Sequence, residues 1–95
     1  MSKKTLQTRK KAYKFIRNNG EWSIVIAQSK DSARSEYKEF YNISDSIYKK
    51  ENIKSLTIKN KKQKIKNMFF DKKIPLEVVI NHIKFPPRVV CDNQD

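Results

Sequence analysis

The segment YKFIRNNGEWSIVIAQS, residues 13–29, constrains the fold more than any other part of the chain. Asn19-Gly20 is a preferred pair for a two-residue type I′ turn, in which both residues adopt positive φ. Gly20 is the only glycine in the sequence, which favours a turn at this point. The pair predicts a β-hairpin whose first arm is a strand over 13–18. A basic helix over 5–17 is the alternative.

The second arm of the hairpin, residues 21–28, is rich in β-branched residues. Successive side chains of a strand point to opposite faces, so one face is large and apolar and the other is small and half-apolar. We therefore expect an inner strand with both faces covered. The two sets are Trp22, Ile24 and Ile26 on one face, and Ser23, Val25 and Ala27 on the other.

Residues 29–42 change to a helical period. Their apolar members follow the i, i+4, i+7, i+8 spacing of one helical face. Ser29 or Asp31 can cap the start by accepting a hydrogen bond from an unpaired backbone N–H. An amphipathic helix packed on the sheet is predicted. Its apolar stripe consists of Ala33, Tyr37, Phe40 and Tyr41.

A polar connection and further strands follow this helix. Residues 43–52 can hold one short helical turn, started by Ser44 or Asp45. Residues 53–60 are predicted to be a strand with Leu56 and Ile58 inward. Because a helix joins it to strand 21–28, we expect the two strands to pair in parallel. Residues 64–70 are predicted to pair back on 53–59 as a hairpin arm, with a short helix as the alternative.

The last third of the chain contains a second predicted helix, over 73–87. Pro75 suits its first turn, where the missing N–H costs nothing, and Pro86-Pro87 ends it. Its apolar face is Leu76, Val79, Ile80 and Ile83. Residues 88–95 show no period and are expected to be a frayed tail or, over 88–91, a short edge strand.

These elements predict a single domain over residues 1–95. It belongs to the α+β class, with a small mixed sheet made of a hairpin and one or two further strands, and about two packed helices. A chain of this length can bury a core sufficient for independent folding.

The net charge of +12 is concentrated in two blocks. Residues 1–19 hold seven basic side chains and no acid, and residues 1–11 are expected to form a flexible basic arm. Residues 53–73 have a net charge of +7, and the remaining stretches are each close to neutral. AT-rich coding DNA also drifts toward lysine, isoleucine and asparagine, so compositional drift is a competing explanation for the charge.

Several classes of protein are disfavoured by the sequence. It has no run of roughly 18 apolar residues that would cross a membrane, and no apolar segment follows the basic N-terminus, so a cytoplasmic location is expected. Cys91 is the only cysteine, which excludes an intramolecular disulfide. Cys91 and His82 alone are too few for a zinc site, and one glycine cannot build a phosphate loop. We expect no metal, no cofactor and no enzymatic activity.

The stretch IKNKKQKIKN, residues 58–67, places five lysines in ten residues without an acid. On the tip of the predicted 53–59/64–70 hairpin, these lysines would contact several phosphates and release their counterions. Lysine favours backbone binding without sequence choice, since bidentate guanine recognition is mainly a property of arginine. The predicted nucleic-acid-binding residues are Arg9, Lys10, Lys11, Lys14, Lys59, Lys61, Lys62, Lys64 and Lys66.

Aromatic side chains beside basic residues can stack on unpaired bases. A domain of this size needs most of its large side chains in the core, so we expect few to be exposed. Tyr48 and one of Tyr13 or Phe15 are the expected exceptions.

The stretch WSIVIAQSKDSARSEYKEFY resembles a set of small uncharacterised proteins encoded by bacteriophages and prophages. The positions that match are Trp22, Ser29, Ala33, Arg34 and Tyr37, and the similarity extends over about residues 22–60. The resemblance implies a viral or mobile-element origin and a bacterial host. It implies no activity.

Three functions are compatible with these observations. The first is an accessory protein that binds the phosphate backbone of DNA or RNA. The second is a non-enzymatic inhibitor or adaptor that docks on an acidic surface of a host protein, in which exposed apolar residues such as Tyr48, Val89 and Val90 would take part. The third is a structural or assembly component.

Overall fold

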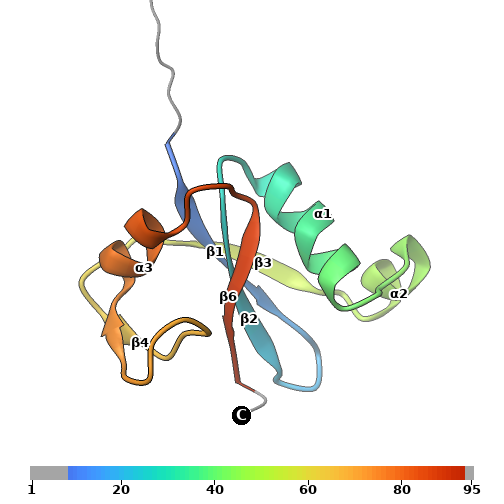
Figure 1. Cartoon of the computed structure of the whole chain (residues 1–95). Coiled ribbons are helices and arrows are strands. Elements are labelled where there is room, and N and C mark those ends of the chain that lie inside the picture. The colour runs from blue at the N-terminus through green and yellow to red at the C-terminus, as the bar shows by residue number, and fades with distance from the viewer. Residues whose placement is uncertain (1–8, 94–95) are drawn as a thin grey trace, which may run out of the picture.

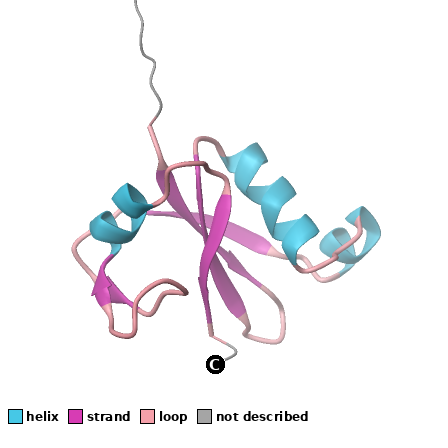
Figure 2. Cartoon of the chain, in the orientation of Figure 1, coloured by secondary structure: helices cyan, strands magenta, loops and turns pink. Residues whose placement is uncertain are grey.

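A computed structural model describes residues 9–93 of the chain. It shows a four-stranded antiparallel sheet with helices on both sides and a separate two-stranded ribbon (Figures 1 and 2). The α+β class is therefore confirmed. In chain order the elements are β1 (Lys11–Ile16), β2 (Trp22–Ala27), α1 (Lys30–Phe40), α2 (Asp45–Lys50), β3 (Lys54–Ile58), β4 (Lys64–Ile65), β5 (Ile74–Pro75), α3 (Leu76–His82) and β6 (Arg88–Asp92).

β1 and β2 form the predicted hairpin, with Ile16 opposite Trp22. Their turn is longer than expected. Gly20 N–H donates to the Arg17 carbonyl, and Arg17 N–H donates to the carbonyl of Glu21. Gly20 has a φ of 90°, whereas Asn19 is not among the residues with positive φ, so the type I′ prediction is wrong. A turn that ends on a left-handed glycine is the usual three-residue hairpin loop.

The strand order in the sheet is β3-β1-β2-β6, and every neighbouring pair is antiparallel. The prediction of a parallel pairing between strands 21–28 and 53–59, and hence of a mixed sheet, is wrong. β3 runs in the same direction as β2, but β1 lies between them. The long connection through α1 and α2 therefore passes over β1 instead of joining neighbouring strands.

The side of the sheet that faces α1 carries an aromatic core. The Phe15 and Tyr37 rings stack with centroids 4.7 Å apart. Tyr13 and Phe15 are both buried, so the prediction that one of them is exposed is wrong, while Tyr48 is half-buried. On α1 itself, Phe40 was predicted to be part of the apolar stripe that faces the sheet, but it is half-exposed, so that part of the prediction is wrong. The aromatic core consists of Tyr13, Phe15, Val25, Ala27, Ala33, Tyr37, Ile43, Ile53 and Val89.

α1 and α2 begin and end in the same way. Ser29 and Ser44 are their N-caps, each accepting a hydrogen bond from a backbone N–H of the first turn. Each helix is followed by an asparagine with positive φ, Asn42 or Asn52, and then by a buried isoleucine. In both cases the backbone N–H groups of the asparagine and of the isoleucine donate hydrogen bonds to carbonyls in the last turn of the helix. Both ends are Schellman motifs, and each isoleucine is thereby placed in the aromatic core.

α3 and the β4–β5 ribbon lie on the opposite side of the sheet (Figure 1). The buried residues on this side form an aliphatic core. α3 buries the predicted face but ends at His82, earlier than expected. β4 pairs with β5, so the predicted hairpin between 64–70 and 53–59 is wrong. The aliphatic core consists of Ala12, Ile24, Ile26, Ile65, Ile74, Leu76, Val79, Ile80, Ile83, Val90 and Cys91.

β6 shows that most of the predicted frayed tail is ordered, since it pairs with β2 and buries its three middle residues. Ile24 lies opposite Cys91 and Val25 opposite Val89, which leaves Val90 as an extra residue in a β-bulge. The bulge turns Val90 and Cys91 to the same side, into the aliphatic core. The Val90 carbonyl accepts a hydrogen bond from Met68 N–H at 3.0 Å, which fixes the 66–72 loop against the sheet edge.

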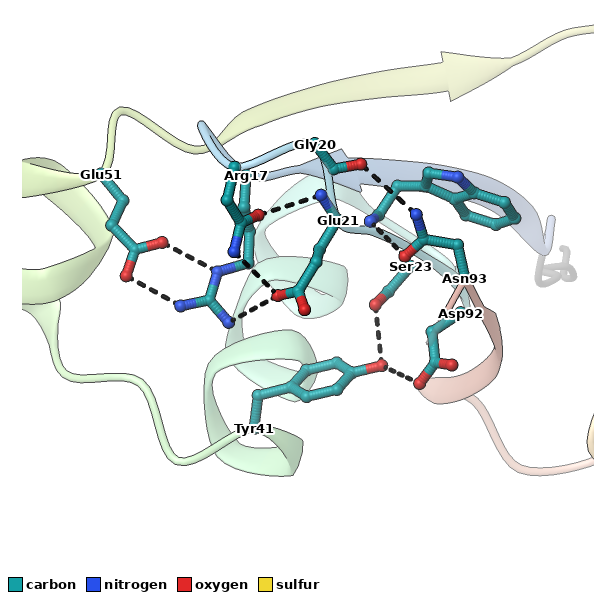
Figure 3. A network of polar contacts seen from close by, with 10 residues as sticks. Arg17, Gly20, Glu21, Ser23, Tyr41, Glu51, Asp92 and Asn93 are labelled. Atoms are coloured by element: carbon teal, nitrogen blue, oxygen red, sulfur yellow. Dashed lines mark hydrogen bonds and ion pairs between the residues drawn. The ribbon is translucent and has the colours of Figure 1, made fainter. Parts of the chain in front are cut away.

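A polar network closes the far end of the β1–β2 hairpin (Figure 3). The Arg17 guanidinium donates two hydrogen bonds of 2.8 Å to the Glu51 carboxylate, and this pairing lowers the pKa of Glu51. The Asn93 side chain accepts from Trp22 N–H at 2.9 Å and donates to the Gly20 carbonyl at 3.4 Å. Residues far apart in the sequence thus hold the turn in place.

Within residues 9–93, the helices are all too short or too polar to cross a membrane.

Candidate functional site

A pocket of about 460 Å³ opens on the aliphatic side of the sheet, between the sheet and the β4–β5 ribbon. Four lysines from three separate segments line it: Lys14, Lys64, Lys66 and Lys73. Among the described residues that line it, Asp92 is the only acid. We call this cavity the basic pocket.

Local structure explains how these lysines meet. Lys14 lies in β1, where alternation places its side chain on the same face as Ala12. Lys64 and Lys66 flank Ile65, whose side chain is buried in the aliphatic core. Both lysines are exposed. Anchoring Ile65 beneath the ribbon therefore leaves a lysine on each side of it at the pocket.

The loop before β4 is held by α3. The backbone N–H groups of Leu76 and Glu77, at the start of α3, donate to the carbonyls of Gln63 and Lys61 at 2.8 and 2.9 Å. These bonds satisfy helix N–H groups that would otherwise lack partners. They also fix the lysine-rich loop 59–63, and Gln63 lines the basic pocket.

Trp22 contributes the only indole ring of the chain to the same pocket. The Lys14 ammonium lies 4.7 Å from the centre of this ring, a cation–π contact. Trp22 is half-buried and packs against the aliphatic core. The remaining apolar lining comes from Ile24, Ile58, Ile65 and Cys91.

The end of the pocket at β6 is polar, with Asp92 and Asn93. The Tyr41 hydroxyl donates to the Asp92 carboxylate at 2.9 Å and accepts from the Ser23 hydroxyl at 2.7 Å (Figure 3). Burial raises the pKa of the Tyr41 phenol well above its ordinary value. Tyr41 therefore stays protonated at neutral pH and holds Asp92 as a hydrogen-bond acceptor.

The structure brings together three of the nine predicted residues, Lys14, Lys64 and Lys66. Lys59, Lys61 and Lys62 are exposed on the adjoining loop and not on the tip of a 53–59/64–70 hairpin. Lys11 points to the opposite face from Lys14, because side chains alternate along β1. The Lys10 ammonium donates to the Ile83 carbonyl at 2.8 Å, and Arg9 is exposed before β1.

The predicted flexible arm, residues 1–11, falls mostly outside the described residues. Its last two members are part of the fold, because Lys11 begins β1 and Lys10 contacts the end of α3.

Two residues of the pocket were not predicted. Lys73 lies at the far end of the same +7 block, and the β4–β5 pairing carries it back to Lys64 and Lys66. Trp22 was predicted as part of one face of an inner strand and, with the other aromatic residues, as a possible stacking surface, but it was not among the predicted nucleic-acid-binding residues. The sequence contains a feature that marks each of them. Basic residues stand just before Ile74-Pro75, and an indole stands at the first position of β2. The tertiary pairing that joins them does not appear in the sequence pattern.

A second surface is mostly apolar and lies beside β6, between α1 and the loops that precede β5 and β6. A groove of about 430 Å³ is lined by apolar residues of α1 and of the loops before β5 and β6, with Glu36 and Arg88 beside them. Its exposed apolar members include Phe40, Met68 and Phe85, and Phe85 is 89% exposed. Val89 and Val90, which we expected to be exposed, are instead buried in the two cores. We call this surface the apolar groove.

Two further side chains carry reactive groups, His82 on the surface and the buried Cys91. The His82 ring lies 5.1 Å from the rings of Phe69 and of Phe70. Cys91 is a buried thiol. In the part of the chain that the structure describes, no three side chains of the His, Cys, Asp and Glu types gather as metal ligands would.

Comparison of the chain with protein-family models, with curated proteins and with solved structures gives no match.

Proposed function

We propose that this protein binds nucleic acid through contacts to the phosphate backbone, largely without sequence specificity. The observation that carries the proposal is the basic pocket, where four lysines from three segments converge with one acid among them. Like charges repel, so their convergence on one hollow is favourable when a polyanion occupies it. Phosphate groups of DNA or RNA are such polyanions.

The neighbouring loop extends the basic surface beyond the pocket. Lys59, Lys61 and Lys62 are exposed and precede β4 directly, so a strand bound at the pocket can continue along them. Lysine ammonium groups act as point charges and do not read base edges in a bidentate way. This supports backbone contacts over recognition of a particular sequence.

As parts of the same proposal, we assign this protein no catalytic role and place it in the cytoplasm of a bacterial host, as an accessory protein of a phage or other mobile element. The assignment to a mobile element is supported by the resemblance of residues 22–60. The assignment of no catalytic role is supported by the surroundings of His82, whose ring lies against those of Phe69 and Phe70, and by the burial of Cys91.

The test is fluorescence anisotropy of labelled duplex DNA and single-stranded RNA, titrated with protein at several salt concentrations. Contact with about four phosphates predicts a log–log salt slope near −4 for duplex DNA. A triple Lys64→Gln, Lys66→Gln, Lys73→Gln variant should reduce the steepness by roughly 2–3. A shallow slope in the unmodified protein would contradict the proposal.

A matched control separates the pocket from general charge. Lys30→Gln, Lys49→Gln and Lys50→Gln together remove the same three charges from exposed positions on α1 and α2. This control should keep most of the affinity and of the salt slope. Equal losses in the two triple variants would show that net charge, and not the basic pocket, determines binding.

A second candidate function is that of a non-enzymatic inhibitor or adaptor of a host protein. It is favoured by the apolar groove, since exposed aromatic residues grouped on one surface are typical of protein contacts. The salt titration separates the two candidates, because an adaptor that acts through the apolar groove needs no steep dependence on salt.

A further inference from the structure

We propose that the basic pocket receives one unpaired nucleotide of a single-stranded nucleic acid, with its base stacked on Trp22 and its phosphates on the surrounding lysines. This inference rests on the proposed function and names the form of nucleic acid that the pocket accepts. It predicts a preference for single strands over duplex.

The chemistry of the pocket has the two parts that a nucleotide requires. Trp22 and the aliphatic floor around Ile24 and Ile58 provide a surface for a flat ring. Lys64, Lys66 and Lys73 provide positive charge beside it. An inorganic anion would use only the second part, whereas a nucleotide would use both. Stacking on an aromatic ring is the common means by which single-stranded bases are bound without sequence choice.

The size of the pocket separates the two forms of nucleic acid. A cavity of about 460 Å³ lies within the range of small-ligand sites, so it suits one nucleotide. The bases of a duplex are paired and stacked inside the helix, and exposing one costs a few kcal/mol. A single strand does not incur this cost, because its bases are already unpaired.

Lys14 links the two parts of the site. Its ammonium lies over the Trp22 ring, 4.7 Å from the ring centre, so a base that stacks on this face takes the place of the ammonium. A nucleotide stacked there brings its own phosphate close to that charge. Lys14 is half-buried in the middle of β1, which limits its freedom before binding. Less side-chain entropy is then lost when the phosphate arrives.

The polar end of the pocket explains why little sequence preference is expected. The Asn93 amide already bonds to Trp22 N–H and to the Gly20 carbonyl. The Asp92 carboxylate already accepts from the Tyr41 hydroxyl. These polar groups already form hydrogen bonds inside the protein. Binding therefore depends on ring stacking, which every base can provide, and on phosphate charge, which every nucleotide carries.

Because Trp22 is the only tryptophan, its fluorescence reports on this site alone. We would titrate the protein with the oligonucleotide dT8, with an eight-base-pair duplex and with dTMP. Saturable quenching by dT8 is expected, with little quenching by the duplex at equal occupancy and much weaker binding of dTMP. Equal affinity for dTMP and dT8 would overturn the proposal in favour of a site for free nucleotides.

A substitution then tests the stacking directly. Trp22→Leu should weaken dT8 binding about 5- to 150-fold, since stacking on an aromatic ring contributes about 1–3 kcal/mol per base. Trp22→Phe should recover part of the loss, and Phe85→Ala, which changes an exposed ring outside the pocket, should have no effect. Circular dichroism checks that each variant is folded, and the quenching experiment stands without any variant.

The outcomes separate this inference from the proposed function. If anisotropy shows tight binding of labelled single strand and duplex alike, without quenching and without loss in Trp22→Leu, the inference fails and the proposed function stands. If neither nucleic acid binds, both fail.

Discussion

On the α1 side of the sheet, aromatic rings stack in direct contact and fill the space between strands and helix. On the α3 side, aliphatic residues without aromatic rings form the buried core, and the short β4–β5 ribbon leaves a pocket lined with lysines. The same strands supply both faces, since alternate residues of β1 and β2 point to opposite sides.

This difference separates two requirements of a small domain. A domain of this size has a total stability of about 5–15 kcal/mol, so it needs at least one tightly packed face. The aromatic core meets that need. The opposite face can then hold converging positive charge, which opposes folding but favours the binding of a polyanion.

The largest effect is expected from the packed face. Phe15→Ala should lower the free energy of unfolding by about 3–5 kcal/mol, because it removes a fully buried ring that stacks on Tyr37. Urea denaturation followed by circular dichroism measures this change. Phe85→Ala is the matched control, and its ring is 89% exposed, so a change within about 0.5 kcal/mol is expected. Similar values for the two variants would remove the distinction between the faces.

An intermediate effect is expected where the two faces are joined. Tyr41→Phe removes the hydroxyl that bonds to Ser23 and Asp92, and leaves the buried Ser23 hydroxyl without that partner. A loss of about 1–2 kcal/mol in the free energy of unfolding is expected. Tyr48→Phe serves as the control, because the Tyr48 hydroxyl donates no hydrogen bond to another residue that the structure describes. A neutral Tyr41→Phe would mean that solvent replaces these bonds at no cost.

The smallest effect on stability is expected from the basic pocket. Lys64→Gln, Lys66→Gln and Lys73→Gln relieve repulsion on the surface, so each should change the free energy of unfolding by no more than about 0.5 kcal/mol. Raising NaCl from 50 to 500 mM should stabilise the unmodified protein slightly, because salt screens the lysines from one another. The triple variant should respond less. A clear loss of stability in that variant would show that these lysines support the fold.

Patterns local in the sequence predicted most of the elements. The alternation in β2, the cap at Ser29 and the apolar face of α3 all depend on residues within one turn or one strand, so they were found. Strand pairing depends on distant contacts. β3 is an edge strand, and its Leu56 is half-exposed, so an apolar residue there does not indicate an inward position. The partner of β3 is β1, which lies about forty residues earlier in the chain.

The candidate site was predicted only in part, for the same reason. The lysine block identified Lys64 and Lys66, but the hairpin assumed for it was wrong. Lys14 and Trp22 line the pocket because β1 and β2, which carry them, are the two central strands of the sheet. β4 folds over the aliphatic side of these strands. Two repeats of asparagine followed by isoleucine, at 42–43 and 52–53, end both helices of the crossover. Asparagine is the most common alternative to glycine at such helix ends, and this signal was available but not used.

The bulged strand β6 has a consequence for how this protein is made. One partner of β2, the strand β1, precedes it directly in the chain, but its other partner, β6, is synthesised roughly 60 residues later. At about 5–20 residues per second, a ribosome needs about 3–12 s to add that stretch. During this time β2, with its apolar side chains, has an open edge that can pair with another chain. The period of greatest aggregation risk is therefore set by the order of synthesis, before the folded protein exists.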